Sequence, residues 1–571
     1  MYILGVWDGH ESGAALLRDN RIIYAASEER FTRRKTELQF PVNSIKAALN
    51  YAKIKPDEVD SVTFTTTEFI KTLDRVFPFI KENYYQFRRR KILKPRPWDV
   101  RHSHWIKYLM TSIGVVPGTA TISKAQVARE LRRLGFSKYK LNVVEHHVAH
   151  AATAAFTSGY KRSLVITLDG LGDGICASIG TLENGRLERH KTIKASDSIG
   201  IFYEQITNIL GMRELEDEGK IMAMADYSYP FDFKDNKFKD FFTVEGTSIK
   251  AKYSWFKQFD MIDRIAWQTP REQVAYMAQQ LLEKVLTEFV QNAIDEYGIG
   301  DVVFAGGIFS NVKANMRIRK LDGVKHWYVF PHMGDGGMAL GGALYTNYLE
   351  NGVSDYKDFN AYLGDEYSEE ETKALLKDEK GLEVQEESLK ESSKHAAELI
   401  NDNNYLFWFQ GRMEYGPRAL GNRSILAPSG NEEVKDRLNL YVKKREWFQP
   451  FAPSLLEEDC DRIFVYDKKG VPKYMTMAYE SKKEMKALLG AVVHVDGTGR
   501  PQAVGDENPA YRDLLKHIKK ETGYGIMLNT SFNIHGEPIV MSPNDALRTM
   551  KLTNTKYMFI NGLFVENKSG I

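Results

Sequence analysis

The sequence predicts an α/β protein with two domains, and three observations lead to this prediction. The 571-residue chain is too long for one hydrophobic core. A strand–turn–strand–turn–strand pattern at residues 2–26 returns at residues 164–193. An acidic, turn-rich stretch at 351–393 then precedes a second α/β segment. The predicted divisions are a first domain at 1–355, a linker at 356–385 and a second domain at 386–571.

Bulk composition is that of an ordinary globular protein, with 43% hydrophobic and 27% charged residues. The net charge of +2 is too small by itself to indicate a nucleic-acid partner. Cys176 and Cys460 lie far apart, which favours a reducing compartment without a disulfide framework. No apolar run approaches the length of a spanning helix, and the first residues do not resemble a signal peptide. We therefore expect a cytoplasmic protein without a membrane anchor.

The two repeated patterns share the order of their parts. Each begins with an apolar strand that ends in Asp-Gly, at Asp8-Gly9 and Asp169-Gly170, followed by a glycine-containing loop and a second apolar strand. Two such halves facing a cleft are the plan of the actin-like ATPase fold, whose hairpin loops offer backbone N–H groups to phosphate. The alternative is a pair of unrelated hairpins.

A candidate metal site follows the first repeat. A helix starting near His146 places His146 and His150 on one face, because positions i and i+4 are neighbours, whereas His147 points elsewhere. Asp169 ends the apolar strand at 164–168. Two imidazoles and a carboxylate suit a borderline divalent metal with open positions. The alternative is that these are polar helix-cap and turn residues.

Residues 84–108 interleave cations and aromatic side chains, including Arg88, Arg89 and Arg90. This composition binds phosphate backbones and stacks bases. The alternative is the solvated face of a helix in an insertion.

Two glycine turns at helix starts occur in succession between residues 301 and 345. Gly306-Gly307 precedes a helix that begins near Asn311, and Asp335 lies between Gly334 and Gly336. Such turns suit an adenine nucleotide whose phosphates lie at the helix N-termini.

The C-terminal part holds the densest polar motifs. Three arginines, Arg412, Arg418 and Arg423, lie in one glycine-punctuated loop. They would be costly to bury without partners, and guanidinium groups present paired donors to phosphate. Further polar residues follow in three motifs: Lys443, Lys444, Arg445 and Glu446; His494, Asp496 and Arg500; Asn529, Thr530, Ser531 and Asn533. We favour an anion site over a surface ion-pair network.

These motifs resemble the carbamoyltransferases of the NodU/CmcH/TobZ family over nearly the whole chain. The shared features include DGHES, EERFTRRK, HHVAHAA, EGK, AGGIFSN, GDGG, GRMEYGPRALGNRSIL, KKRE, PFAPS, HVDGTGRPQ and NTSFN. The resemblance implies an N-terminal TsaD-like domain of actin-like fold and a C-terminal YrdC-like α/β domain.

The resemblance also implies a division of labour. The YrdC-like domain would use carbamoyl phosphate and ATP, with Mg²⁺ accompanying the ATP, to make carbamoyl adenylate. The TsaD-like domain would then transfer the carbamoyl group to an acceptor hydroxyl at a metal site, with iron(II) as the family's metal. The implied residues are Arg418, Lys443, Arg500 and Ser531 for the first step; Arg423, Arg445, Gly306, Gly307, Asn311 and Gly336 for the nucleotide; His146, His150, Asp169 and Asp335 for the metal; and His10 as the base near the acceptor.

Two positions depart from the family pattern. The usual HDAS loop is HESG here, at residues 10–13, and Gln449 replaces the usual arginine before PFAPS. The acceptor also stays open. A small-molecule hydroxyl, as on a sugar or natural product, is the family's usual acceptor, and a 5-hydroxymethyl pyrimidine in DNA or a nucleotide is the alternative that the basic stretch raises. A non-catalytic nucleotide sensor and a homodimer are further alternatives.

Overall fold

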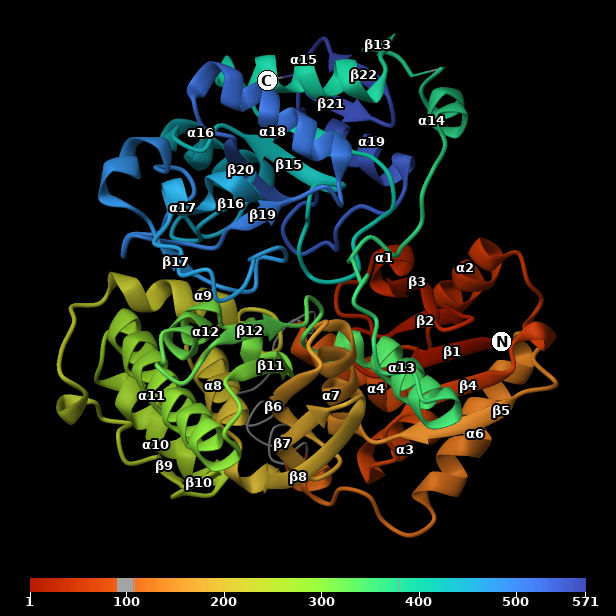
Figure 1. Cartoon of the computed structure of the whole chain (residues 1–571), viewed down its shortest axis with the longest axis vertical. Coiled ribbons are helices and arrows are strands. Elements are labelled where there is room, and N and C mark those ends of the chain that lie inside the picture. The colour runs from red at the N-terminus through yellow and green to blue at the C-terminus, as the bar shows by residue number, and fades with distance from the viewer. Residues whose placement is uncertain (90–105, 107, 378, 571) are drawn as a thin grey trace. The chain divides into compact units, whose positions relative to one another are not determined.

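The computed structural model of the chain describes residues 1–89, 106, 108–377 and 379–570 (Figure 1). The chain forms two compact units. Unit 1 comprises Met1–Glu28 and Thr36–Phe359, and unit 2 comprises Glu29–Lys35 and Asn360–Ile571. A short segment from the first part of the sequence therefore belongs to unit 2.

Unit 1 contains two five-stranded sheets with the same strand order. The first runs β3-β2-β1-β4-β5 and the second runs β8-β7-β6-β11-β12. In both, the first three strands along the chain are antiparallel to one another, and the last two add in parallel. The strand bounds are β1 (Tyr2–Trp7), β2 (Gly13–Arg18), β3 (Arg21–Ser27), β4 (Ser61–Thr65), β5 (Lys140–Val144), β6 (Arg162–Gly172), β7 (Ile175–Glu183), β8 (Arg186–Lys194), β11 (Asp301–Ala305) and β12 (His326–Val329).

This shared topology confirms the predicted duplication and the actin-like fold class, since two unrelated hairpins would not each acquire the same two parallel strands. One detail differs from the prediction. Strand β6 does not end at Asp169 but continues to Gly172, with its pairing to β7 interrupted after Leu168. Asp169 thus lies in an irregular extension of the strand.

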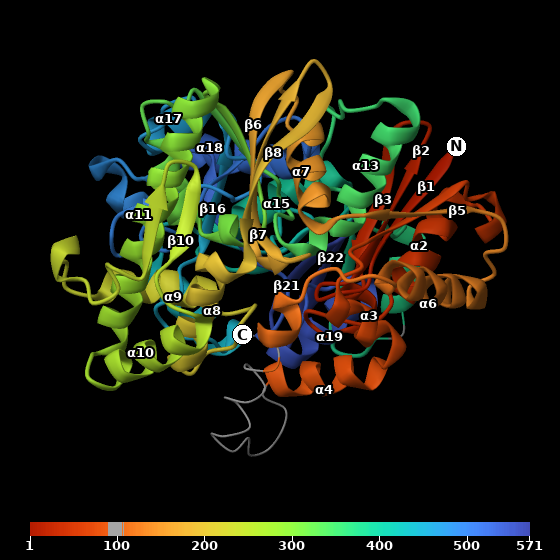
Figure 2. The ribbon, with the colours of Figure 1, turned by 90° about the horizontal axis from the view of Figure 1, so that it is seen from below.

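Helices α7 (His146–Thr157) and α13 (Met338–Asn351) pack against each other and connect the two sheets of unit 1. Helix α7 packs on β6 and β11, and α13 packs on β1 and β4, as Figure 2 shows from below. The remaining helices of unit 1 are α2 (Val42–Ala52), α3 (Phe69–Val76), α4 (Pro78–Arg88), α6 (Thr119–Arg133), α8 (Ile199–Ile209), α9 (Glu218–Met224), α10 (Trp255–Trp267), α11 (Arg271–Tyr297) and α12 (Val312–Arg319). A hairpin of β9 (Phe242–Glu245) and β10 (Ser248–Ala251) packs on α11.

Unit 2 is built on one mixed sheet of eight strands, which confirms the α/β class for this part of the chain. The strand order is β13-β22-β21-β14-β15-β20-β16-β19. The strand bounds are β13 (Leu382–Glu386), β14 (Leu406–Phe409), β15 (Arg423–Ala427), β16 (Ala452–Leu456), β19 (Gln502–Val504), β20 (Ile526–Ser531), β21 (Tyr557–Ile560) and β22 (Leu563–Asn567); the short β17 (Tyr479–Glu480) and β18 (Thr498–Gly499) pair separately.

The core of unit 2 lies between this sheet and a helix pair, α15 (Leu389–Asn401) and α18 (Pro509–Thr522). Trp408, Tyr511 and Leu514 are among the fully buried side chains there, so apolar burial holds the helix pair on the sheet. The other helices are α1 (Glu29–Thr32), α14 (Glu369–Leu376), α16 (Glu432–Arg437), α17 (Cys460–Ile463) and α19 (Pro543–Thr553).

The stretch at 356–385, expected to be a linker, is more ordered than the sequence indicates. It contains α14 and most of β13, which forms the edge of the eight-stranded sheet by pairing antiparallel with β22. Side chains Glu383, Gln385 and Glu386 of β13 are exposed, as charged residues on an edge strand commonly are. Within the described part of the chain, no helix has the length and apolar character to cross a membrane.

Candidate functional site

Four candidate metal ligands meet in unit 1. His146 and His150 lie one turn apart on α7, whose first turn is capped by the Glu145 carboxylate accepting from the Val148 N–H. Asp169 comes from the end of β6, and Asp335 begins the short 3₁₀ turn before α13. One ligand atom from each residue lies within 4.8 Å of the other three. The structure thus brings together all four residues predicted as metal ligands.

The distances inside this group are short and regular. His146 Nε2 lies 3.2 Å from Asp169 Oδ2 and 3.3 Å from Asp335 Oδ1. His150 Nε2 lies 3.5 Å from each of the same two oxygen atoms. Gly172 makes this approach possible, because a Cβ there would stand 2.3 Å from His146 Cγ.

The electrostatics of the four groups are complementary. Burial alone would lower the pKa of His146, but the carboxylates of Asp335 and Asp169 outweigh it and hold that pKa well above its ordinary value. Burial alone would raise the pKa of Asp169, but the two imidazoles hold it well below its ordinary value. The site therefore concentrates two negative charges against two basic nitrogens.

This donor set fits a divalent transition metal. Two imidazole nitrogens and two carboxylates are the ligands that iron(II), zinc and similar ions take in proteins. His150 Nε2 and Asp335 Oδ1 are fully buried, yet neither makes a hydrogen bond with any described residue. Buried polar atoms without a hydrogen-bond partner are rare, and an ion at this point would satisfy both.

Two further histidines near the cluster have distinct roles. His147 faces away from it, with Nδ1 at 2.8 Å from Thr167 Oγ1, as the helical spacing predicts. His10 Nδ1 lies 3.2 Å from Asp335 Oδ2, and its side chain is partly exposed. Burial outweighs the attraction of Asp335 and lowers the pKa of His10 to about 3, so the imidazole is neutral at physiological pH. An imidazole with so low a pKa is a weak base, so the role of His10 as the base near the acceptor stays a prediction.

The glycine turns predicted to frame adenosine border the same cluster. Gly306 has φ +106°, and a Cβ there would stand 2.2 Å from the Leu168 carbonyl oxygen, so only glycine fits. The N–H of Gly307 donates to Asp169 at 3.1 Å, and that of Gly336 donates to Glu11 at 3.3 Å. Asn311 caps α12 and exchanges hydrogen bonds with Gln279. Gly307 and Gly336 thus lie next to the carboxylates of Asp169 and Asp335, whereas Asn311 bonds to Gln279. The contact of these residues with a nucleotide stays a prediction.

A second polar site lies in unit 2 and is centred on Lys443. Its Nζ donates to the carbonyl oxygen and hydroxyl of Ser531 at 2.7 and 3.1 Å, and to the carbonyl and side-chain oxygens of Asn533 at 3.1 and 2.5 Å. The side chain is buried at the end of a π-helical turn that follows α16. The predicted pair of Lys443 and Ser531 is therefore in direct contact.

Three arginines share this environment. Burial lowers the pKa of Arg500 well below its ordinary value, and the positive charges of Arg418 and Arg445 lower it further. Burial likewise lowers the pKa values of Arg418 and Arg445 to about 10. Three guanidinium groups gathered in this way would favour the binding of an anion.

Arg423, predicted to contact the nucleotide, is bonded to the backbone of its own loop. Its side chain is fully buried and donates to the carbonyl oxygens of Gln410, Gly411 and Asn422 at 2.6, 3.1 and 3.1 Å. Its guanidinium also stacks on Phe409, 3.6 Å from the ring centre. Arg423 therefore holds the GRMEYGPRALGNRS loop on its strand, and its contact with a nucleotide stays a prediction.

Gln449 takes part in a local network. Its Oε1 accepts from Arg445 Nη1 at 3.3 Å, and its Nε2 donates to Glu446 Oε2 at 2.5 Å. The amide thus bridges a cation and a carboxylate of the preceding turn. An arginine at this position would meet Arg445 with a like charge.

The basic stretch at 84–108 is only partly within the described residues, since 90–105 and 107 lie outside them. Arg88 is buried and donates to Thr36 Oγ1 at 2.7 Å, and Arg89 is buried against Glu216. These two arginines are used inside unit 1. They do not present a surface to nucleic acid.

Sequence reasoning assigned no role to the EERFTRRK motif, which the structure places beside the second site. Glu29–Lys35 groups with unit 2, and Lys35 lies close enough to interact electrostatically with Lys443. The available signal was the motif itself, which has four basic residues within six positions, Arg30, Arg33, Arg34 and Lys35, shortly after a strand.

Comparison with known families agrees with this pair of sites. The carbamoyltransferase N-terminus model matches residues 2–344, and the carbamoyltransferase C-terminus model matches residues 397–567. The chain belongs to the carbamoyltransferase family. It is accordingly an enzyme of the carbamoyltransferase class, and the alternative of a non-catalytic sensor is not supported.

Relatives of this carbamoyltransferase cover most of its length. An uncharacterized protein of Methanocaldococcus jannaschii, MJ1058, is 34% identical over 88% of this chain and 86% of its own. The nodulation protein NolNO of Sinorhizobium fredii is 29% identical over 98% of this chain and 79% of its own. The 3'-hydroxymethylcephem-O-carbamoyltransferase of Streptomyces clavuligerus is 30% identical over 52% of this chain and 55% of its own.

Proposed function

We propose that this carbamoyltransferase works in two steps at two sites. Unit 2 converts carbamoyl phosphate and ATP to carbamoyl adenylate, and unit 1 transfers the carbamoyl group to an acceptor hydroxyl. The observation that carries the proposal is that the two units contain different kinds of polar residues. Lys443 and three arginines lie close together in unit 2, whereas four metal donors and His10 gather in unit 1.

The first step brings several negative charges into one place. One water is consumed as carbamoyl phosphate yields phosphate and carbamate, and a carbamate oxygen then displaces pyrophosphate from the α-phosphorus of ATP. Phosphate, carbamate and ATP would repel one another unless positioned cations offset their charges. Lys443, Arg418, Arg445 and Arg500 are such cations, and Lys443 is already oriented by Ser531 and Asn533.

The second step needs an activated carbonyl and a base. His146, His150, Asp169 and Asp335 would hold a divalent metal, iron(II) by resemblance to the family, which polarises the carbamoyl carbonyl when bound. His10 would take the proton from the acceptor hydroxyl at a ring nitrogen, since its imidazole lies beside the cluster, 3.2 Å from Asp335. The hydroxyl oxygen then bonds to the carbamoyl carbon, and AMP leaves.

We propose a small-molecule hydroxyl as the acceptor. The relative from Streptomyces clavuligerus carbamoylates a hydroxymethyl group on a cephem, according to its name. The burial of Arg88 and Arg89 removes two of the cations that had raised the alternative of DNA.

The test is to incubate the protein with ATP, carbamoyl phosphate and Mg²⁺ and to measure pyrophosphate. We expect pyrophosphate release that requires carbamoyl phosphate, together with a carbamoyl adenylate detected by mass spectrometry. Lys443→Met should abolish it, and the matched variant Lys444→Met, which changes the exposed neighbouring lysine, should not. Absence of pyrophosphate from wild-type protein, with or without added metal, would refute the first step.

A further inference from the structure

The segment Glu29–Lys35 leaves unit 1 and packs with unit 2, although strand β3 precedes it and helix α2 follows it in unit 1. Both ends of this excursion are held at the same residue of unit 1. The Glu28 N–H donates to the Ser12 carbonyl at 2.7 Å, and the Ser12 N–H donates to the Glu37 carbonyl at 3.0 Å. The segment is therefore a closed loop with fixed ends, not a frayed connection.

Arg30 reaches the first of two loops that carry the anion site. Its Nη2 donates to the Gly416 carbonyl oxygen at 2.8 Å, and its Nη1 pairs with Glu29 at 2.9 Å. The side chain is buried. Gly416 stands two residues before Arg418, so this contact fixes the backbone from which Arg418 projects.

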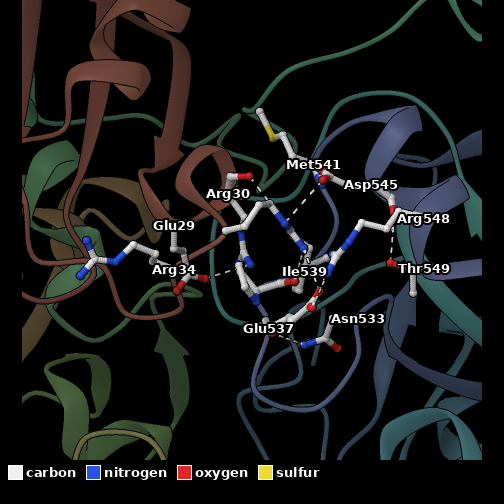
Figure 3. Close-up of polar contacts among 12 residues, drawn as sticks. Glu29, Arg30, Arg34, Asn533, Glu537, Ile539, Met541, Asp545, Arg548 and Thr549 are labelled. Carbon is white, nitrogen blue, oxygen red and sulfur yellow. Dashed lines mark hydrogen bonds and ion pairs between the residues drawn. The ribbon is translucent and has the colours of Figure 1, made fainter. Parts of the chain in front are cut away.

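Arg33 reaches the second loop, which runs from Ser531 to Met541. Its Nη2 and Nη1 donate to the carbonyl oxygens of Pro538 and Ile539 at 2.8 and 2.7 Å, and its Nε lies 3.5 Å from Asp545. Figure 3 shows Arg30, Ile539, Met541 and Asp545 gathered at this point. One guanidinium thus holds two successive peptide groups of the loop.

The second loop also contacts Lys443, through Asn533. Asn533 Nδ2 donates to the Glu537 carbonyl oxygen at 2.6 Å, one residue before the peptides that Arg33 holds. The Oδ1 of the same Asn533 accepts from Lys443. Phe31 adds an apolar anchor by packing against Met413, Ile539 and Met541. A continuous set of contacts therefore leads from Arg33 to the ammonium group.

We propose that Arg30 and Arg33 are positioning residues for carbamoyl adenylate formation. This proposal rests on the function proposed above. Arg30 would fix the backbone of the loop that carries Arg418, and Arg33 would fix the loop that carries Asn533, which orients Lys443. Neither arginine contacts the reacting atoms. Both act by donating hydrogen bonds to peptide carbonyl oxygens. A guanidinium group offers two parallel N–H donors for this purpose, and an amide or alkyl side chain of similar size does not.

The test compares Arg33→Gln with Arg548→Gln. Arg548 makes an ion pair with Glu537 in the same loop, but it is half exposed and holds no backbone carbonyl. Both changes remove one positive charge. We expect Arg33→Gln to lower kcat/KM for pyrophosphate release by about 10²-fold, because small displacements of catalytic groups cost that much. Arg548→Gln should stay close to wild type.

A second readout does not depend on activity. Amide hydrogen exchange over 531–541 should quicken in Arg33→Gln and not in Arg548→Gln. The milder Asp545→Asn keeps an oxygen to cap α19 while weakening the ion pair with Arg33, so it provides a folded variant if Arg33→Gln melts early. It should show a smaller change in the same direction.

The outcomes separate the two proposals. Quicker exchange together with slower pyrophosphate release in Arg33→Gln would support the positioning role. Exchange and kinetics equal to those of Arg548→Gln would overturn it. Wild-type protein that releases no pyrophosphate, while exchange over 531–541 still responds to Arg33→Gln, would refute the proposed function and leave the loop-holding role standing.

Discussion

Lys443 is a buried lysine whose ammonium group points at four oxygen atoms of Ser531 and Asn533. Burial lowers its pKa well below the ordinary value of 10.5, and the charges of Arg445 and Lys35 lower it further. The unfolded chain therefore binds a proton more readily than the folded one, so this group makes the free energy of unfolding rise with pH between the two pKa values. A bound anion would raise the pKa of Lys443 again, because its negative charge favours the charged ammonium group.

This coupling predicts a pH-dependent affinity for anions. Above the pKa that Lys443 has in the free protein, each bound anion must be accompanied by a proton, so affinity should fall by about tenfold per pH unit. Titration calorimetry with sulfate, whose charge is constant over this range, measures it. Lys443→Met should bind sulfate more weakly with little dependence on pH. The same steep dependence in that variant would assign the proton to another group.

His150 allows a test of the proposed separation of the two steps. His150→Ala removes one metal donor, so transfer should fall by about 10³-fold, equivalent to ~4 kcal/mol of lost polarisation. Pyrophosphate release should be unchanged. His147→Asn is the control, since the ring nitrogens of His147 contact Thr167 and the Ile175 carbonyl oxygen and do not belong to the donor set. Bound metal is measured by elemental analysis. Loss of both steps in a folded His150→Ala protein would contradict the proposed division.

At this scale, the sequence identified the metal donors better than the anion ligands. Helical periodicity alone pairs His146 with His150, and the end of an apolar strand marks Asp169. The arginines of GRMEYGPRALGNRS cannot be sorted in this way, because their roles depend on where carbonyl oxygens lie after folding. Arg423 Nη1 donates to three such carbonyls, although the Nε of Arg423, like that of Arg418, is buried without a hydrogen bond to any described residue.

The duplicated strands of unit 1 have diverged in how they use an equivalent aspartate. Asp8 follows β1 as Asp169 follows the regular part of β6, yet Asp8 is paired with cations of α3 and α4. Arg75 donates to its two oxygens at 2.9 and 2.7 Å, and Lys81 Nζ lies 3.6 Å away. These charges outweigh burial and lower the pKa of Asp8 below its ordinary value. Asp8, at the end of β1, therefore stabilises the fold, whereas Asp169, in β6, belongs to the group of four candidate metal ligands.

Removing one partner of the buried Asp8 carboxylate should lower the free energy of unfolding substantially. Arg75→Met leaves the Asp8 carboxylate buried beside Lys81 alone, so we expect a loss of about 3–5 kcal/mol in the free energy of unfolding. Denaturant titration measures it. Arg133→Met, which breaks an exposed pair with Glu130, should change stability by less than about 1 kcal/mol. Equal effects of the two variants would show that the buried network contributes little.

Elements with strong periodicity were predicted closely, and weakly apolar ones were not. The second repeat, predicted at 164–193, corresponds to β6, β7 and β8, which together span residues 162–194. Strand β13 and helix α14 were missed, because an exposed edge strand lacks the buried face that makes alternation visible. Helix α1 is a single turn, too short for any periodicity to show.

At the scale of the molecule, the units are joined by more than the backbone after Phe359. The excursion of Glu29–Lys35 means that unit 2 contains chain from both sides of that point. A protease site inserted between Phe359 and Asn360 should therefore yield two fragments that remain together on gel filtration. Adding Arg30→Ala and Arg33→Ala should allow them to separate. Separation of the cleaved parent protein would show that the packing of this segment is weak.

The same excursion has a consequence for biosynthesis. Ribosomes release this segment hundreds of residues before the loops at Gly416 and Pro538. Arg30 and Arg33 therefore cannot make their contacts with these loops until Gly416 and Pro538 have left the exit tunnel. Completion of the polar site around Lys443 is thereby made conditional on an early-synthesised segment that has stayed intact.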